Sequence, residues 1–317
     1  MRKLGVAVIG CGSWGKNHVR VYSELDCVDL LAVSDVNEHL VREIGEKYGV
    51  DWYIDSDNIF EREDVEAVSI CTPTITHAEI ALRAIEADKH TLIEKPMANS
   101  IDEAQQIIST ARRRNVDLMV GFVERFNPAV TEAINIVSSK KIGEIILAHA
   151  RRVSRRPLRI GDVGIIKDLA IHDIDVTLQL FKKEVIRDVY AVAGSIAHKF
   201  EDYANITIRF LGNKNVFIET NWLTPRKIRR LIVTGTEGTL NIEYIPQEIT
   251  VENKVGSYSP FLTIEEPLRL ELEHFVTSIL QGIPPSPSGE DGLKALQVCE
   301  AALKSTQTHR PEKIEGL

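Results

Sequence analysis

The chain has 317 residues, of which 44% are hydrophobic and 26% are charged, and its formal net charge is -8. This length exceeds what one hydrophobic core usually organises, so two domains are expected. The negative charge argues against general nucleic-acid binding, which depends on clustered Lys and Arg. No apolar run of the sequence reaches the roughly 20 residues that a membrane helix requires. We therefore expect a soluble, cytoplasmic protein with neither nucleic-acid nor membrane partners.

The first part of the chain alternates short apolar runs with amphipathic helical patterns. The expected strands are Gly5 to Ile9, Leu30 to Ser34, Ala67 to Cys71, His90 to Ile93 and Asp117 to Phe122. The expected helices are Trp14 to Leu25, Glu38 to Tyr48, His77 to Ala87 and Ile101 to Arg114. Strands that are apolar throughout and separated by helices predict a doubly wound parallel sheet, so the fold class is α/β.

The pattern changes after a further helix at about Val130 to Ser139. Longer strands with alternating residues follow, at Ile145 to Val153, Val185 to Ala193, Ala204 to Phe210, Asn215 to Trp222, Arg229 to Thr234, Thr239 to Tyr244 and Glu248 to Glu252. Two helices close the chain, at about Leu268 to Gln281 and Gly289 to Thr306. Successive strands with few helices predict an α+β domain with a largely antiparallel open sheet. We expect one domain over residues 1–123 and a second over residues 124–317.

The four cysteines are far apart in the sequence. Cys11, Cys27, Cys71 and Cys299 form neither a paired framework nor the close CxxC spacing of a zinc site. We therefore expect free thiols and no metal.

A glycine motif connects the first strand to the first helix. Gly10, Gly12 and Gly15 form G-x-G-x-x-G, with Ser13 and Trp14 between the last two glycines. Such glycines allow a tight turn, a close backbone approach to a pyrophosphate, and packing of helix on strand. A lone motif of this kind is a weak signal, but the strand before it and the helix after it strengthen it. The sequence predicts a dinucleotide-binding Rossmann domain.

An acidic residue ends the second strand about 20 residues after the glycines, at the usual position of a ribose partner. This residue is Asp35, whose carboxylate would accept hydrogen bonds from a 2'-hydroxyl and repel a 2'-phosphate. NAD is therefore favoured over NADP. Capping of the helix at Asn37-Glu38 is an alternative role for Asp35.

A lysine follows the expected strand His90 to Ile93, in the tripeptide Glu94-Lys95-Pro96. The carboxyl ends of parallel strands border the ligand crevice, so Lys95 is expected beside the reactive end of the cofactor. Alone, such a residue would usually be a surface lysine at a turn.

Three polar residues share a helical spacing. Asp168, His172 and Asp175 lie at i, i+4 and i+7, which places them on one face of a regular helix. An acid four residues before a histidine can orient its ring as a general base requires. A purely structural role for the histidine remains open at this point.

Five motifs occur together along the chain. They are Gly10-x-Gly12-x-x-Gly15 with His18, Cys71-Thr72-Pro73 followed by His77, Glu94-Lys95-Pro96, Arg125-Phe126-Asn127-Pro128, and the Asp168-to-His172 helix. In this order and spacing they closely resemble the Gfo/Idh/MocA oxidoreductases, over essentially the whole chain. The Glu-Lys-Pro tripeptide combined with the D-x-x-x-H helix is the most specific part of the resemblance.

The resemblance implies roles for several residues. It implies that Lys95, Asp168 and His172 are catalytic, and that the Lys95–Pro96 peptide bond is cis. It also implies an open sheet that mediates homodimers or homotetramers. The cofactor would be NAD, lined by the glycine-loop residues Gly10, Gly12, Ser13, Trp14 and Gly15, by Asp35, and by Thr72, Pro73, His77, Glu94, Lys95 and Arg125.

Two further segments resemble one branch of the family. Thr220 to Pro225 and Val233 to Gly238 are similar to members that act on nucleotide-linked amino sugars, notably UDP-N-acetylglucosamine 3-dehydrogenases. Eight arginines could pair with a substrate diphosphate, or could equally form a charged sheet edge. They are Arg151, Arg152, Arg155, Arg156, Arg159, Arg226, Arg229 and Arg230.

The expected activity is NAD-dependent oxidation of a secondary hydroxyl of a sugar-type substrate, possibly C3 of a UDP-N-acetylhexosamine. His172 would act as the base, Asp168 as its orienting partner, and Lys95 as the ammonium that holds the reacting oxygen. Lys95 as the base is an alternative. Other functions that stay open are an inositol or simple sugar dehydrogenase, a redox-neutral lyase or glycosidase that uses NAD, and a non-catalytic dinucleotide sensor.

Overall fold

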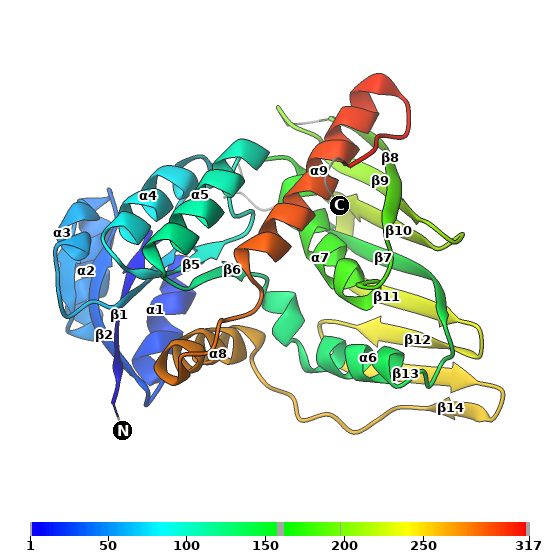
Figure 1. Cartoon of the computed structure of the whole chain (residues 1–317), viewed down its shortest axis with the longest axis horizontal. Coiled ribbons are helices and arrows are strands. Elements are labelled where there is room, and N and C mark those ends of the chain that lie inside the picture. The colour runs from blue at the N-terminus through cyan, green and yellow to red at the C-terminus, as the bar shows by residue number, and fades with distance from the viewer. Residues whose placement is uncertain (1, 157–161, 197, 315–317) are drawn as a thin grey trace. The chain divides into compact units, whose positions relative to one another are not determined.

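A computed structural model describes residues 2–156, 162–196 and 198–314 (Figure 1). The chain forms two compact units, each built from two separate stretches of sequence. The first unit comprises Met1–Val123 and Leu268–Leu293, and the second comprises Glu124–Pro267 and Lys294–Leu317. Arg159 lies outside the described residues.

The first unit is built around a six-stranded parallel sheet. Its strands are β1 (Leu4–Ile9), β2 (Val28–Ser34), β3 (Asp51–Tyr53), β4 (Ala67–Ile70), β5 (His90–Glu94) and β6 (Leu118–Gly121). The spatial order is β3-β2-β1-β4-β5-β6, and every neighbouring pair is parallel. All six residues of β1 are buried, as expected for a strand covered on both faces. This arrangement confirms the predicted doubly wound Rossmann sheet.

The helices of this unit begin and end at residues with clear local signals. They are α1 (Gly15–Glu24), α2 (Glu38–Tyr48), α3 (Asp57–Phe60), α4 (Thr74–Glu86) and α5 (Ile101–Arg114). Asn37 caps α2 through a bond from the Leu40 N–H, and Gly49 ends it in the left-handed region at φ 67°. Ser100 and Glu103 form a capping box at the start of α5. Figure 1 shows α4 and α5 side by side.

A late segment of the chain completes the first unit. Helix α8 (Pro267–Gln281) and the residues after it pack with the Rossmann sheet, whereas the sequence placed all of 124–317 in the second domain. The Val120 N–H donates to the Pro287 carbonyl at 3.0 Å, and Arg269 forms an ion pair with Glu24. Sequence periodicity identified the helix, but it carries no information about which sheet the helix joins.

The second unit contains an eight-stranded mixed sheet. Its strands are β7 (Ile145–Arg155), β8 (Ile186–Gly194), β9 (Tyr203–Phe210), β10 (Asn215–Asn221), β11 (Leu223–Gly235), β12 (Gly238–Glu243), β13 (Glu248–Asn253) and β14 (Gly256–Tyr258). The spatial order is β14-β13-β12-β11-β7-β10-β9-β8, and only the pairing of β7 with β10 is parallel. This confirms the largely antiparallel sheet, in which β9 and β10 form an antiparallel pair.

Helices cover one face of this sheet. Helices α6 (Pro128–Ser138) and α7 (Ile171–Leu180) lie against it, with α6 next to β12 and β13 and α7 next to β7 and β10 (Figure 1). A final helix, α9 (Gly289–Thr308), begins in the first unit and ends in the second. No helix of the described residues is long and apolar enough to cross a membrane.

Candidate active site

The glycine loop between β1 and α1 has the shape that a dinucleotide requires. A side chain at Gly10, which has φ +90°, would lie 2.7 Å from the backbone of Cys71 and Thr72. One at Gly15 would lie 1.8 Å from the Gly10 carbonyl oxygen. At Gly12, in contrast, an added Cβ would meet no atom within 4 Å. Gly12 is therefore the position where backbone is open to a pyrophosphate, and the loop fits NAD.

Asp35 lies directly against this loop. Its Oδ2 accepts a hydrogen bond from the Cys11 N–H at 2.7 Å, and its Oδ1 accepts one from the Asn37 N–H at 2.9 Å. The cap of α2 is Asn37 rather than Asp35, so the helix-cap alternative is wrong. A carboxylate fixed at the end of β2 beside the first glycines is well placed to accept bonds from ribose hydroxyls.

Glu94 is a buried carboxylate that joins the glycine loop to the end of β5. Its Oε1 accepts hydrogen bonds from Trp14 Nε1 at 2.7 Å and His18 Nε2 at 3.2 Å, and its Oε2 accepts one from the Lys95 N–H. Burial by itself would raise the pKa of Glu94, but His18, Lys95 and Trp14 together lower it below its usual value. The glycine at position 121 provides space for the Glu94 carboxylate, because a Cβ there would lie 2.6 Å from Glu94 Oε1.

The Lys95–Pro96 peptide bond is cis, as the resemblance implied. The His77 ring lies between the two loops that were expected to line the cofactor: its Nδ1 is 2.9 Å from the Pro96 carbonyl oxygen, and its Nε2 is 2.9 Å from that of Thr72. Pro73 is the N-cap residue of α4. The predicted residues that follow β1, β2, β4 and β5 therefore share the carboxyl edge of one sheet. Ser13 is exposed in the glycine loop.

In the second unit, Asp168 and His172 lie on two different kinds of helix. Asp168 is buried in a π-helical turn, η2 (Ile166–Ala170), and His172 is half-buried at the second position of α7. The expectation of one regular helical face through Asp168, His172 and Asp175 is therefore wrong. A π-turn closes bonds from i to i+5, which changes the phase between residues before and after it, and such turns are frequent at functional sites.

Arg125 and Asp175 form an ion pair within the second unit. Arg125 Nε donates to Asp175 Oδ2 at 2.7 Å, and a second bond joins Nη2 to Oδ1. The side chains are only 9% and 1% exposed. Asp175 therefore fixes Arg125, the residue expected to line the cofactor.

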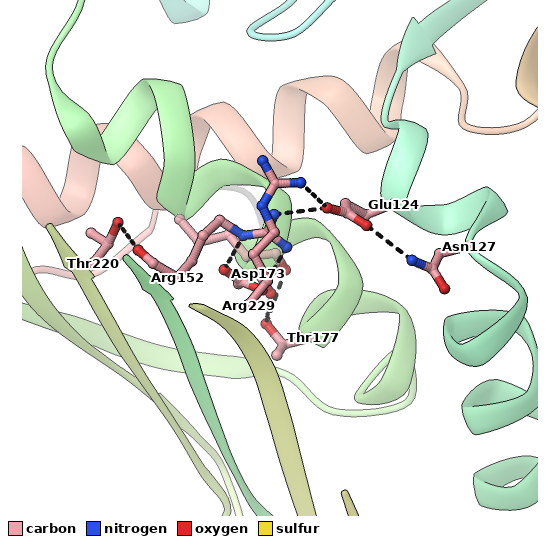
Figure 2. Close-up of polar contacts among 8 residues, drawn as sticks. Glu124, Asn127, Arg152, Asp173, Thr177, Thr220 and Arg229 are labelled. Carbon is pink, nitrogen blue, oxygen red and sulfur yellow. Dashed lines mark hydrogen bonds and ion pairs between the residues drawn. The ribbon is translucent and has the colours of Figure 1, made fainter. Parts of the chain in front are cut away.

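A network of mostly buried charges connects α7 with β7 and β11 (Figure 2). The Arg152 side chain is 1% exposed and donates from Nε to Asp173 Oδ2 at 2.7 Å and from Nη1 to Glu124 Oε1 at 2.8 Å. The same Glu124 oxygen accepts a bond from Arg229 Nη1 at 3.1 Å. Burial would raise the pKa of Glu124, but the Arg152 and Arg229 charges lower it. Arg152 thus connects β7 to α7, the helix that carries His172. Because its side chain is buried, Arg152 forms neither of the two alternatives considered for it, a contact with a substrate diphosphate or part of a charged sheet edge.

The register of the sheet separates the other arginines. Arg152 is opposite Arg229 on neighbouring strands, and Arg151 is opposite Arg230. Alternate residues of a strand point to opposite faces, so Arg151 and Arg230 lie on the face away from α7. There they form ion pairs with Glu219 and Glu243. Of these four arginines, Arg152 and Arg229 lie on the face that carries α7, and of those two only Arg229 has a partly exposed side chain.

Comparison with protein families decides the assignment. An oxidoreductase family with an NAD-binding Rossmann fold matches residues 4–122, and the GFO/IDH/MocA C-terminal domain matches residues 130–241. The chain belongs to the Gfo/Idh/MocA family. It is therefore an oxidoreductase whose first unit is an NAD-binding Rossmann domain, which confirms the predicted family, fold and cofactor.

Relatives within the Gfo/Idh/MocA family match nearly the full chain. The myo-inositol 2-dehydrogenase of Thermotoga maritima is 29% identical over 336 residues, covering 98% of this chain and 99% of the relative. The inositol 2-dehydrogenase of Rhizobium meliloti is 29% identical over 327 residues, covering 97% and 98%. A solved structure of UDP-N-acetylglucosamine 3-dehydrogenase from Acidithiobacillus ferrooxidans has a TM-score of 0.89 at 25% identity, covering 97% of this chain and 99% of that one.

The sequence did not reveal the hydrogen bonds and ion pairs that hold the candidate site residues in place. It named Glu94 and Trp14 as separate cofactor-lining residues, without their mutual bond, and it did not single out Asp173 or Glu124. A signal existed for Asp173, since three acids within eight residues, Asp168, Asp173 and Asp175, exceed what one histidine can use.

Proposed function

We propose that this chain oxidises a secondary hydroxyl of a sugar-type substrate with NAD as the hydride acceptor, and that the C3 hydroxyl of a UDP-N-acetylhexosamine is the best candidate. The main support is the carboxyl edge of the Rossmann sheet. That edge carries the glycine loop, Asp35 and Lys95 on one side of one unit. An ammonium group near a bound dinucleotide suits an alcohol oxygen that gains negative charge as it reacts.

The chain's own residues divide the remaining work. NAD, when bound, supplies the hydride acceptor. His172 takes the hydroxyl proton, Asp168 orients the imidazole and stabilises its charged form, and Lys95 holds the reacting oxygen. The glycine-loop residues, Asp35, Thr72, Pro73, His77, Glu94 and Arg125 hold the cofactor. Glu94 acts by fixing Trp14 and the Lys95 backbone, and Asp175 acts by fixing Arg125.

Inositol oxidation is the second candidate. Two relatives at 29% identity over nearly the full chain are inositol 2-dehydrogenases, and inositol presents the same kind of secondary hydroxyl. The two candidates differ in charge, since inositol is neutral and a UDP-linked sugar carries a diphosphate.

Cofactor turnover tests the proposal directly. The purified chain is incubated with NAD and, separately, UDP-N-acetylglucosamine, myo-inositol and a simple hexose, and NADH is followed by its absorbance. NADH should accumulate with at least one of them. Product formation without NADH would instead identify a redox-neutral lyase or glycosidase. Binding of NAD without any reaction would identify a sensor.

We further propose that the chain forms a homodimer or homotetramer through the sheet face away from α7. That face exposes Tyr190 and Val192 on β8 and Phe217 on β10, with β9 between the two strands. Large apolar side chains exposed together on one sheet face suit an interaction site. Light scattering on Phe217→Glu should show a smaller assembly than the unchanged chain, and an unchanged mass would exclude this face.

The chemistry of the cysteines supports a reducing compartment such as the cytoplasm. Cys11, Cys27, Cys71 and Cys299 are free thiols. Burial, together with the charge of Asp35, raises the pKa of Cys11 to about 12, so this thiol is protonated at neutral pH. Cell fractionation of the native protein would test the compartment.

A further inference from the structure

We propose that Arg229 and Lys227 bind an anionic group of the substrate, so that the substrate is a phosphorylated or carboxylated sugar rather than a neutral one. This inference rests on the proposed dehydrogenase function and names the substrate class of the same site. Both residues belong to β11 and lie on the second unit, whose α7 face carries the candidate catalytic residues Asp168 and His172.

The carboxylates of the network are engaged mainly by Arg152. Arg152 bonds both oxygens of Asp173, at 2.7 and 3.1 Å, and also bonds Glu124 Oε1 at 2.8 Å. Among the described residues Arg229 bonds only that shared Glu124 oxygen, at the longer distance of 3.1 Å, and its side chain is 30% exposed (Figure 2). One carboxylate oxygen shared between two guanidinium groups leaves Arg229 with hydrogen-bonding capacity for a further acceptor.

Lys227 lies two residues before Arg229 on β11, and because side chains alternate along a strand, both belong to the same face of the sheet. Among the described residues Lys227 takes part in no hydrogen bond or ion pair. The charge of Arg229, followed by burial and the charge of Arg152, lowers the pKa of Lys227. Burial and the charge of Arg152 also lower the pKa of Arg229. Two cations that repel each other at a partly exposed position are stabilised when an anion binds both of them.

Arg229 also lies on the sheet face that carries α7. It is opposite Arg152 on the neighbouring strand, and Arg152 bonds Asp173, the residue after His172 on α7. We therefore place an anion held by Arg229 in the same ligand that Asp168 and His172 address. A guanidinium suits this task, because its planar donors match phosphate and carboxylate oxygens in pairs.

The test compares charged and neutral substrates in matched variants. Arg229→Gln, Lys227→Gln and Arg230→Gln are assayed with UDP-N-acetylglucosamine, glucose 1-phosphate, glucuronate, myo-inositol and glucose. Arg230 is the control, because it is the next residue on the same strand and pairs with Glu243 on the opposite face. Arg229→Lys, which keeps the charge, should retain part of the effect.

We expect KM for the anionic substrate to rise roughly tenfold to 100-fold in Arg229→Gln and Lys227→Gln, as for a lost charged hydrogen bond. Arg230→Gln should leave it unchanged. Preference for the phosphorylated sugars over glucuronate, or the reverse, identifies the anion. Lys227 forms no ion pair among the described residues, so its variant should fold normally even if Arg229→Gln does not.

Two outcomes are distinguishable. If neutral sugars are oxidised as well as anionic ones and neither variant alters KM, the inference is overturned while the dehydrogenase function stands. If no substrate yields NADH, thermal shift with UDP and with glucuronate decides. A shift that is lost in both variants supports anion binding, and no shift in the unchanged chain overturns it.

Discussion

The two units of the chain handle charged side chains in opposite ways. In the Rossmann unit the important groups stand at one edge of a sheet and are held by backbone and ring N–H groups: Asp35 by two backbone N–H groups, and Glu94 by Trp14, His18 and the Lys95 N–H. In the second unit they are held by other charges, as Arg152 is by Asp173 and Glu124. Changes in the first unit should therefore alter function locally, whereas changes in the second should also alter stability.

The largest effect is expected at His172 and Asp168. His172→Ala should lower kcat by roughly 100-fold to 10,000-fold, the range for a lost general base. Asp168→Asn added to His172→Ala should cost little more, because groups that act as a unit are non-additive. Single-turnover rates of both single variants and the double variant measure this.

The pH profile provides an independent check of the pair. Activity should fall at low pH as the imidazole is protonated, and this limb should move to lower pH in Asp168→Asn, because a nearby carboxylate favours the charged ring. Additive losses in the double variant would mean that the two side chains act separately. That result would remove the paired mechanism and leave the dehydrogenase function intact.

Replacement of Arg152 tests whether the buried charges of the second unit contribute to its stability. Arg152→Met leaves Asp173 and Glu124 buried without their main partner, and breaking a buried ion pair in this way costs about 3–5 kcal/mol. Urea unfolding measures the loss. Arg151→Met is the matched control, since Arg151 is half-exposed in its ion pair with Glu219 and should cost no more than about 1 kcal/mol. Equal losses would contradict the distinction between the two faces of β7.

Lys95 should behave as a purely functional residue of the first unit. Lys95→Ala should lower turnover by about 100-fold or more, because a charge that stabilises the reacting oxygen is lost. NAD binding, measured by calorimetry, should persist, and the unfolding midpoint should change little. Lys47→Ala, on the exposed side of α2, serves as the control. Near-normal turnover in Lys95→Ala would exclude its catalytic role.

The smallest expected effect concerns cofactor preference. Asp35→Ser should shift the ratio of NAD to NADP efficiency towards NADP by about tenfold, equivalent to about 1.4 kcal/mol, since the carboxylate no longer repels a 2'-phosphate. Asp35→Asn keeps an acceptor for the Cys11 N–H and removes only the charge. The two variants therefore separate charge from loop geometry. A wild-type preference for NADP would show that Asp35 does not select the cofactor.

The same contrast explains what the sequence predicted. The Rossmann unit could be predicted from sequence because its signals are local: glycines at fixed spacing, an acid at the end of the next strand, and helix caps such as Ser100 and Glu103. Two of its elements were missed, β3 and α3, which have three and four residues. Helix α4 begins at Thr74, earlier than the expected His77, with Pro73 at its N-cap position.

For the second unit, the sequence predicted the strands but not how they pair or how their side chains interact. Alternation predicted its strands, but not the parallel pairing of β7 with β10. It also did not predict the bonds of Arg152 to Asp173 and to Glu124, which are 21 and 28 positions away in the sequence. The π-turn at Ile166–Ala170 was also invisible, because its residues fit a regular helix equally well. Contacts between residues that are far apart in the sequence produce no periodic pattern from which a single sequence could predict them.

Helix α8 has a consequence for how the chain reaches its native state during synthesis. Its buried residues Leu272 and Phe275 are translated only after the whole second sheet. An emerging chain that ends at residue 123 therefore lacks a helix of its own Rossmann unit and cannot finish that unit first. A gene fragment encoding residues 1–123 should yield an aggregation-prone product, and a fragment that joins 1–123 to 268–293 through a short linker is the better candidate for an autonomous NAD-binding module.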